Sequence, residues 1–201
     1  RPRLLAPAAS RRSVATAVRR YALPRSRSTA LLRQLAATAL LSGGHRLLPY
    51  RLRVRLPGSI EEHLREVLGG PLHVSIYTGP DRANRKPVLH LMHPLGETAG
   101  FAKVGTSALT RSLVRAEAAA LVTLTRAGLR RVTVPWIRHH GSWRGHEVLV
   151  QCPLPVWLRR SPAAPERLAA AMWEVAGCRG VGEGVLCGAP RSEERRCRER
   201  V

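Results

Sequence analysis

The sequence predicts an α+β protein, in which a five-stranded antiparallel sheet packs against one long helix. Three observations predict this class. Short stretches between 72 and 151 alternate apolar and polar residues, as strands do. Short turns separate the first three of these stretches. The apolar residues of 107–127 recur with the period of a helix. With 201 residues, 44% of them hydrophobic, the chain is long enough for one domain with a core.

The segment 1–58 is predicted to be a basic extension that precedes the folded lobe. Residues 1–60 contain 13 arginines and no acidic residue, so more than half of the formal net charge of +21 lies there. Helices are expected around 12–21 and 29–41. Such a segment attracts nucleic acid or an anionic membrane. An organelle transit peptide and the Arg- and Ala-rich bias of a GC-rich coding sequence are the alternatives.

The lobe, predicted over 59–160, begins with a short helix. Ser59 can cap the helix, and Glu62 stands three residues later, as a capping box requires. Gly69 can end the helix. The apolar face is expected to consist of Ile60, Leu64, Val67 and Leu68.

Three strands are expected next, over 72–78, 87–93 and 98–105. The segments 79–86 and 94–97 between them are short and rich in turn-forming residues, so an antiparallel meander is expected. The residues of the first strand that are expected to face the core are Leu72, Val74 and Ile76.

The helix predicted over 107–127 has Ser107 as a possible cap and ends before Gly128. A hairpin that turns near Gly145 is expected to follow it and to supply the last two strands. The apolar stripe of the helix is expected to consist of Leu109, Leu113, Ala120, Leu121 and Leu124.

Lys103, on the third strand, is one of only two lysines, whereas the other 32 basic residues are arginines. Glu117 lies inside the predicted apolar stripe of the helix that follows, and a carboxylate on a buried face needs a partner. Lys103 is the candidate partner. In the alternative interpretation, Glu117 is solvated at the edge of the stripe beside Arg111 or Arg115.

Four segments occur in a recognisable order: HVSIYTG…PVLHLM, FAKV, RAEAAAL and VTVPWIRHHGSWRGHEVLVQCPLP. In this order, residues 72–160 resemble the N-terminal lobe of the aminoglycoside phosphotransferase and protein-kinase-like superfamily. The resemblance implies that Lys103 holds the α- and β-phosphates of ATP and that Glu117 positions Lys103. It also implies that the 79–86 loop, with Gly79, covers the phosphates. The residues that it implies beside the adenine are Gln151, Cys152 and Leu154.

The chain departs from this superfamily where the chemistry would occur. Phe101 stands where protein kinases carry a small alanine over the adenine, and the 79–86 loop has a single glycine. Phosphoryl transfer needs one Asp to orient the acceptor hydroxyl and another to hold the metal ions, but Asp81 is the only Asp in the sequence. No catalytic residue is therefore assigned, and Mg²⁺ and a small-molecule hydroxyl acceptor are expected only for an intact relative.

The segment 161–201 is interpreted as an incomplete helical lobe. A helix is expected at about 165–176, and the loss of periodicity after it is interpreted as truncation or a frameshift, with a disordered tail as the alternative. No metal site is expected, since the cysteines lack zinc-ligand spacing and are expected to be free thiols of a cytoplasmic protein. No apolar run approaches the ~20 residues of a membrane span. The alternative function is a non-enzymatic basic module that binds nucleic acid or membrane through 1–60.

Overall fold

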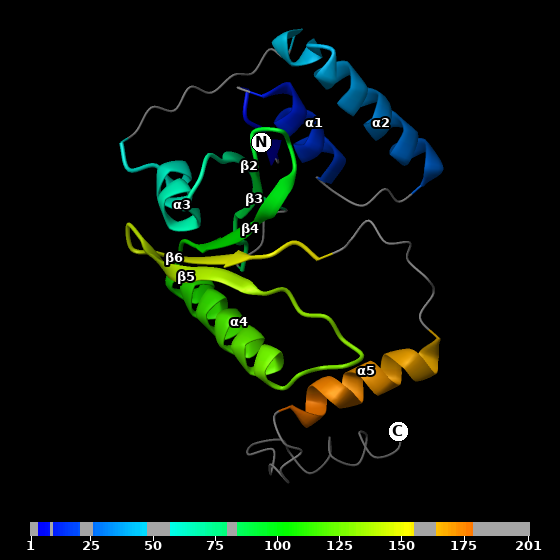
Figure 1. Cartoon of the computed structure of the whole chain (residues 1–201), viewed down its shortest axis with the longest axis vertical. Coiled ribbons are helices and arrows are strands. Elements are labelled where there is room, and N and C mark those ends of the chain that lie inside the picture. Colours follow the sequence, from blue (N-terminus) through cyan, green and yellow to red (C-terminus); the bar gives the residue numbers. More distant parts are fainter. Residues whose placement is uncertain are drawn as a thin grey trace.

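The computed structural model of the chain describes residues 4–8, 10–20, 26–47, 57–79, 84–154 and 164–178. The fold is α+β, with one open antiparallel sheet in the order β1-β2-β3-β4-β6-β5 (Figure 1). The strands are β1 Leu4–Leu5, β2 His73–Tyr77, β3 Val88–Met92, β4 Thr98–Gly105, β5 Ile137–Trp143 and β6 His146–Gln151. The helices are α1 Arg11–Arg20, α2 Arg27–Leu41, α3 Ile60–Leu68, α4 Ala108–Arg126 and α5 Pro165–Gly177, with a short 3₁₀ turn at Gly44–Leu47.

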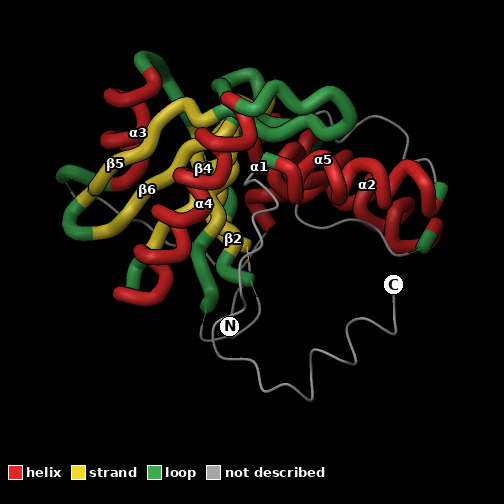
Figure 2. Tube along the Cα trace, turned by 90° about the horizontal axis from the view of Figure 1, so that it is seen from below, coloured by secondary structure: helices red, strands yellow, loops and turns green. Residues whose placement is uncertain are grey.

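The predicted class and the antiparallel arrangement are confirmed, but the sheet has six strands rather than five. The additional edge strand is β1, in which Leu4 lies opposite Tyr77 and Leu5 opposite Ile76 of β2. The predicted single packed helix is also corrected, because α1 and α3 pack on the sheet as well as α4. The two helices expected in the extension are present as α1 and α2, which lie side by side (Figure 1 and Figure 2).

Different helices pack on the two faces of the sheet, since α3 and α4 lie on opposite sides of β5 and β6 (Figure 1). Residues directly opposite each other in antiparallel strands share a face. The α3 face carries the main core, formed by Leu64 of α3 with Leu89, Leu91, Ala102, Val104, Val148 and Val150. The α4 face carries two neighbouring rows: Ser75, His90, Phe101 and Gln151, and beside them Tyr77, Val88, Lys103 and Leu149.

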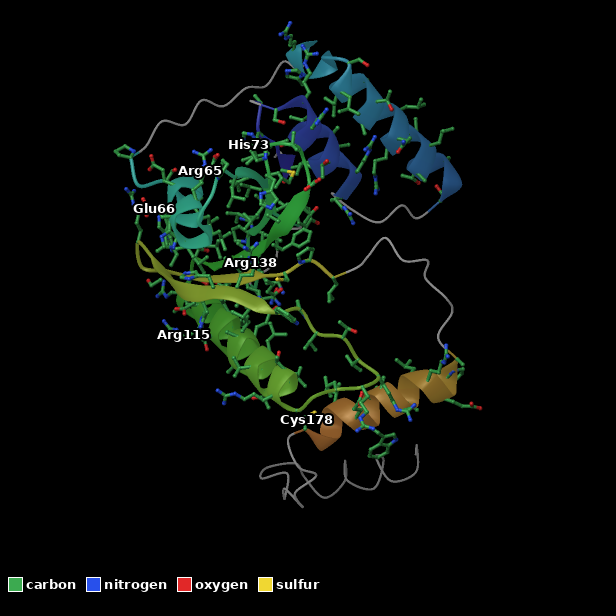
Figure 3. All side chains as sticks on the ribbon, viewed as in Figure 1. Arg65, Glu66, His73, Arg115, Arg138 and Cys178 are labelled. Atoms are coloured by element: carbon green, nitrogen blue, oxygen red, sulfur yellow. The ribbon has the colours of Figure 1, made fainter. Side chains whose placement is uncertain are left out.

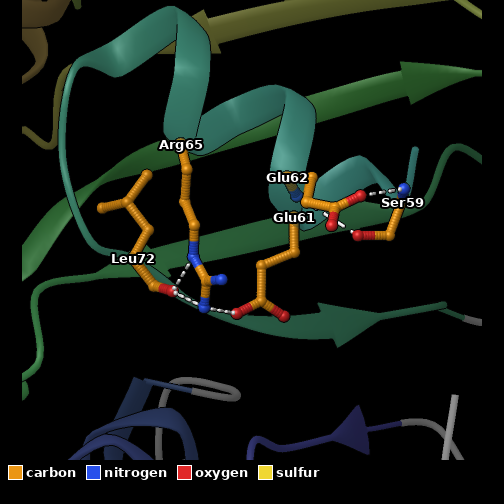
Figure 4. A network of polar contacts seen from close by, with 5 residues as sticks. All are labelled: Ser59, Glu61, Glu62, Arg65 and Leu72. Atoms are coloured by element: carbon orange, nitrogen blue, oxygen red, sulfur yellow. Dashed lines mark hydrogen bonds and ion pairs between the residues drawn. The ribbon is translucent and has the colours of Figure 1, made fainter. Parts of the chain in front are cut away.

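The predicted capping box begins α3. The Glu62 amide donates to Ser59 Oγ at 3.2 Å, and the Ser59 amide donates to Glu62 Oε2 at 3.1 Å. Arg65 then fixes the helix to the chain that leads into β2, because its Nε and Nη2 donate to the carbonyl of Leu72 at 3.1 and 3.0 Å while Nη2 also contacts Glu61 (Figure 4). These contacts hold α3 over its face of the sheet.

The burial of β2 differs from the alternation that the sequence predicted. Ser75 is buried, whereas Val74 and Ile76 are only half-buried. The physical reason for the burial of Ser75 is that α1 folds onto the side of β2 that was expected to face solvent.

The predicted Ser107 cap begins α4, since its Oγ accepts from the Thr110 amide at 3.2 Å. The predicted stripe is wrong at Leu109, whose side chain is 51% exposed. The Thr110 hydroxyl accepts a hydrogen bond from the amide of Ser107 at 2.8 Å, and Thr110 rather than Leu109 is buried at the start of the helix. The residues of α4 that are buried are Thr110, Val114, Ala118 and Leu121.

The remaining predicted elements are found close to their expected places. The β5–β6 hairpin turns at Arg144 and Gly145, both at positive φ, as a two-residue hairpin turn requires. The C-terminal helix is α5, and Glu174 ties it to the loop after α4 by accepting the amides of Arg130 and Arg131 at 2.8 and 2.9 Å. None of the helices in the described ranges is both long and apolar enough to cross a membrane.

Candidate functional site

Lys103 and Glu117 meet on the α4 face of the sheet. Lys103 lies near the end of β4, and the chain passes directly from β4 into α4, which carries Glu117 about two and a half turns along. Lys103 Nζ forms an ion pair with Glu117 Oε1. The side chains are 29% and 26% exposed, so the pair is partly withdrawn from solvent but open to it. The sequence predicted this contact.

Two further side chains contact the same carboxylate. Lys86 Nζ lies 3.5 Å from Glu117 Oε2, and Gln151 Nε2 donates to Glu117 Oε1 at 3.1 Å. Sequence reasoning missed the role of Lys86, although its rarity was a usable signal: both lysines of this chain contact one glutamate. We call Lys86, Lys103, Glu117 and Gln151 the lysine–glutamate cluster.

The alternative partners of Glu117 are engaged elsewhere. Arg115, which projects from α4 (Figure 3), donates from Nε to Glu147 Oε2 at 2.9 Å. Glu147 is nearly buried and also contacts His140 Nε2 at 2.9 Å. Arg111 Nη1 reaches the carbonyl of Thr106 at 3.5 Å. The two arginines that neighbour Glu117 on α4 therefore have other partners.

The electrostatics of the cluster favour an anion. Burial on its own would raise the pKa of Glu117, but hydrogen bonds from Lys103 and Gln151 and the charges of both lysines outweigh it, so the pKa lies below its usual value. The carboxylate is thus ionised at neutral pH. Two ammonium groups and one carboxylate leave an excess of one positive charge beside solvent, which attracts a phosphate group.

Next to the cluster, the α4 face carries an aromatic pair. The ring of Phe101 stacks on His90 with a centroid distance of 4.8 Å and an interplanar angle of 14°. His90 Nε2 lies 2.9 Å from Thr98 Oγ1, whereas its buried Nδ1 has no hydrogen-bond partner. Burial, with a smaller contribution from the charge of Arg20, lowers the pKa of His90 to about 4. His90 is therefore neutral at physiological pH.

Of the other residues that the sequence predicted to bind the nucleotide, only Gln151 belongs to the lysine–glutamate cluster. Gln151 joins it, and the amide of the next residue, Cys152, donates to the carbonyl of Trp136 at 2.8 Å. Leu154 is half-buried at the end of the same described segment. Gly79 follows β2 with φ +67°, but Asp81 and the rest of the segment 80–83 in the 79–86 loop lie outside the described residues. The adenine and phosphate-loop roles stay predictions.

Metal-binding geometry is not found in the part of the chain that the structure describes. There, no three His, Cys, Asp or Glu side chains are arranged to hold a metal ion. The described cysteines, Cys152 and Cys178, are free thiols. No family model matches the chain, and the comparisons with curated proteins and with solved structures find no match either.

Proposed function

We propose that this chain is a nucleotide-binding lobe of the kinase-like type, in which Lys103 holds the α- and β-phosphates of ATP and Glu117 positions Lys103. The observation that carries the proposal is the Lys103–Glu117 ion pair, formed between β4 and α4. The strand and helix order around this pair supports the same interpretation, because β2, β3 and β4 precede α4, and β5 and β6 follow it.

Each residue of the lysine–glutamate cluster has a different role in the proposed phosphate binding. Glu117 neutralises part of the charge of both lysines and restricts Lys103 to one direction on the α4 face, so less side-chain entropy is lost when a phosphate binds. Lys86, at the entry to β3, supplies a second ammonium group within reach of the same region. Gln151 donates a further hydrogen bond to the same carboxylate oxygen that pairs with Lys103.

The proposal is for binding and not for phosphoryl transfer. The described residues offer no carboxylate set for Mg²⁺, and Glu117 is already engaged by two lysines. Mg²⁺ is therefore expected to arrive with the ATP phosphates, and no catalytic step is assigned to this chain. An acceptor hydroxyl and metal-holding aspartates belong to an intact relative of the superfamily that the sequence resembles.

The test is the binding of ATP to the full chain by isothermal titration calorimetry, with and without Mg²⁺. Lys103→Ala removes a charged hydrogen-bond donor and is expected to weaken ATP binding about 10- to 100-fold. Arg167→Ala is the control, because it removes one positive charge at an exposed position of α5. Equal weakening by the two variants would show that ATP is held only by the net charge, and the proposal would be wrong.

A second candidate function is a basic module that binds nucleic acid, favoured by α1. This helix carries four exposed arginines and no acidic residue: Arg11, Arg12, Arg19 and Arg20. Binding through these residues should weaken steeply with salt and should survive Lys103→Ala. A fluorescent single-stranded oligonucleotide titrated at two salt concentrations therefore separates this function from the first.

A further inference from the structure

The N-terminal helix α1 lies over the part of the α4 face that α4 leaves uncovered. Ala17 and Arg20 of α1, with Leu4 of β1, close one side of a small cavity. The other side is formed by residues of both rows on the sheet: Ser75, Tyr77, Val88, His90 and Phe101. Val88 and Tyr77 belong to the same row as Lys103, so this covered area adjoins the lysine–glutamate cluster.

The position of α1 is fixed by close contacts. Ser10 Oγ donates to the carbonyl of Pro94 at 3.2 Å, in the turn between β3 and β4. In the same turn, a Cβ added to Gly96 would lie 3.0 Å from the backbone of Arg12, so the two segments touch. Four residues of α1 are buried, namely Ser13, Val14, Ala15 and Ala17, because α1 packs against both α2 and β2.

The packing of the α4 face leaves one place for the base of a nucleotide. If the phosphates contact Lys103, the base has to lie along the same face of the sheet. On one side of Lys103, that face is filled by Leu149 against Val114 and Ala118 of α4, all of which are buried. The base therefore has room only on the other side, over Phe101 and Val88, where α1 lies.

We propose that α1 is an internal cover of the nucleotide site, and that α1 and the base of ATP compete for the same surface. This inference rests on the proposed function. Its quantitative basis is the size of the cavity, about 90 Å³. That volume is well below the range of about 300–1,000 Å³ that pockets for drug-sized ligands span. ATP cannot occupy the cavity while α1 is in place.

Competition of this kind has two consequences. ATP lowers the population of molecules in which α1 is docked. In turn, the apparent Kd for ATP equals the intrinsic Kd divided by the fraction of molecules in which the site is open, so docked α1 weakens binding. A substitution that weakens the docking of α1 should therefore tighten ATP binding without touching the phosphate contacts. This is opposite to the usual effect of damage to a binding protein.

The experiment combines hydrogen exchange with one matched pair of variants in the full chain. Amide exchange over residues 11–20 is measured by mass spectrometry with and without saturating Mg-ATP. Val14→Asn places an amide at a buried position of α1, where Val14 is 4% exposed, and so weakens the packing that holds the helix in place. Leu31→Asn is the control, since it makes a similar apolar-to-amide change on α2 at a side chain that is 62% exposed.

The inference expects ATP to speed exchange in α1, Val14→Asn to tighten ATP binding about tenfold, and Leu31→Asn to leave binding unchanged. Slower or unchanged exchange in α1 when ATP binds would overturn the inference while the proposed function stands. If neither the natural chain nor Val14→Asn binds ATP, the proposed function fails and the cover falls with it. Should Val14→Asn not fold, the exchange measurement on the natural chain decides alone.

Discussion

Replacing Glu117 with Gln tests the centre of the site. The substitution keeps the shape of the side chain and removes its charge, so the ammonium groups of Lys86 and Lys103 remain side by side without a counter-ion. Breaking a buried ion pair costs about 3–5 kcal/mol, whereas an exposed pair contributes about 0–1 kcal/mol. Because Glu117 and both lysines are about a quarter exposed, we expect a loss of about 2 kcal/mol.

The assay is urea and thermal denaturation followed by far-ultraviolet circular dichroism. A loss of about 2 kcal/mol corresponds to a fall in Tm of roughly 4–8 °C for a chain of this size. Glu61→Gln is the matched control, since Glu61 pairs with Arg65 on the surface of α3, and we expect it to cost less than about 0.5 kcal/mol.

The effect of Glu117→Gln should also depend on pH. The pKa of Glu117 is lowered in the folded protein, so its contribution to stability is complete above the unfolded pKa of 4.5 and is lost as the pH falls below it. The difference between the natural protein and the variant should shrink accordingly in acid. If Glu117→Gln costs no more than Glu61→Gln at pH 7, the partly buried cluster does not form as described and the kinase-like interpretation loses its basis.

Two further predictions concern the core around the site. The pKa of His90 is about 4 when folded and 6.5 when unfolded, so the free energy of unfolding should fall by about 3 kcal/mol as the pH drops from 6.5 to 4. In urea denaturation curves measured across this pH range, His90→Phe should make the free energy of unfolding depend less on pH. An unchanged pH dependence would contradict the burial of the ring. Gly105→Ala should cost about 1–3 kcal/mol of stability in urea denaturation, because the added Cβ would lie 2.7 Å from backbone atoms of Arg111. Gly70→Ala is the control and should be nearly neutral, since open space surrounds Gly70. An equal loss of stability in the two variants would refute the close packing at Gly105.

Much of the lobe could be predicted because its signals are local. Ser59 with Glu62, the alternating strands and the turn at Gly145 each depend on residues close together in the chain, and each is found in the structure. The Lys103–Glu117 contact was also predictable, since the strand and the helix that carry these residues follow one another directly and a carboxylate near a packed face needs a partner.

The N-terminal segment shows where sequence reasoning fails. Nothing local in Leu4–Leu5 predicts an edge strand, because its partner, β2, lies about 70 residues further along the chain. The arginines of α1 indicated a basic extension that precedes the folded lobe, yet Ala17 and Arg20 line a cavity together with residues of the sheet. Lys86 was missed for a similar reason, since its contact with Glu117 spans 31 positions and depends on the register of β3 beside β4.

The convergence of both lysines on Glu117 makes the site chemically addressable. Reductive methylation with ¹³C-formaldehyde labels primary amines, and the only side chains in this sequence that carry one are those of Lys86 and Lys103. A labelled sample would therefore give two side-chain methyl resonances, both from the same few ångströms of the molecule. Their chemical shifts would report directly on what approaches this carboxylate, without any substitution and without assigning the rest of the spectrum.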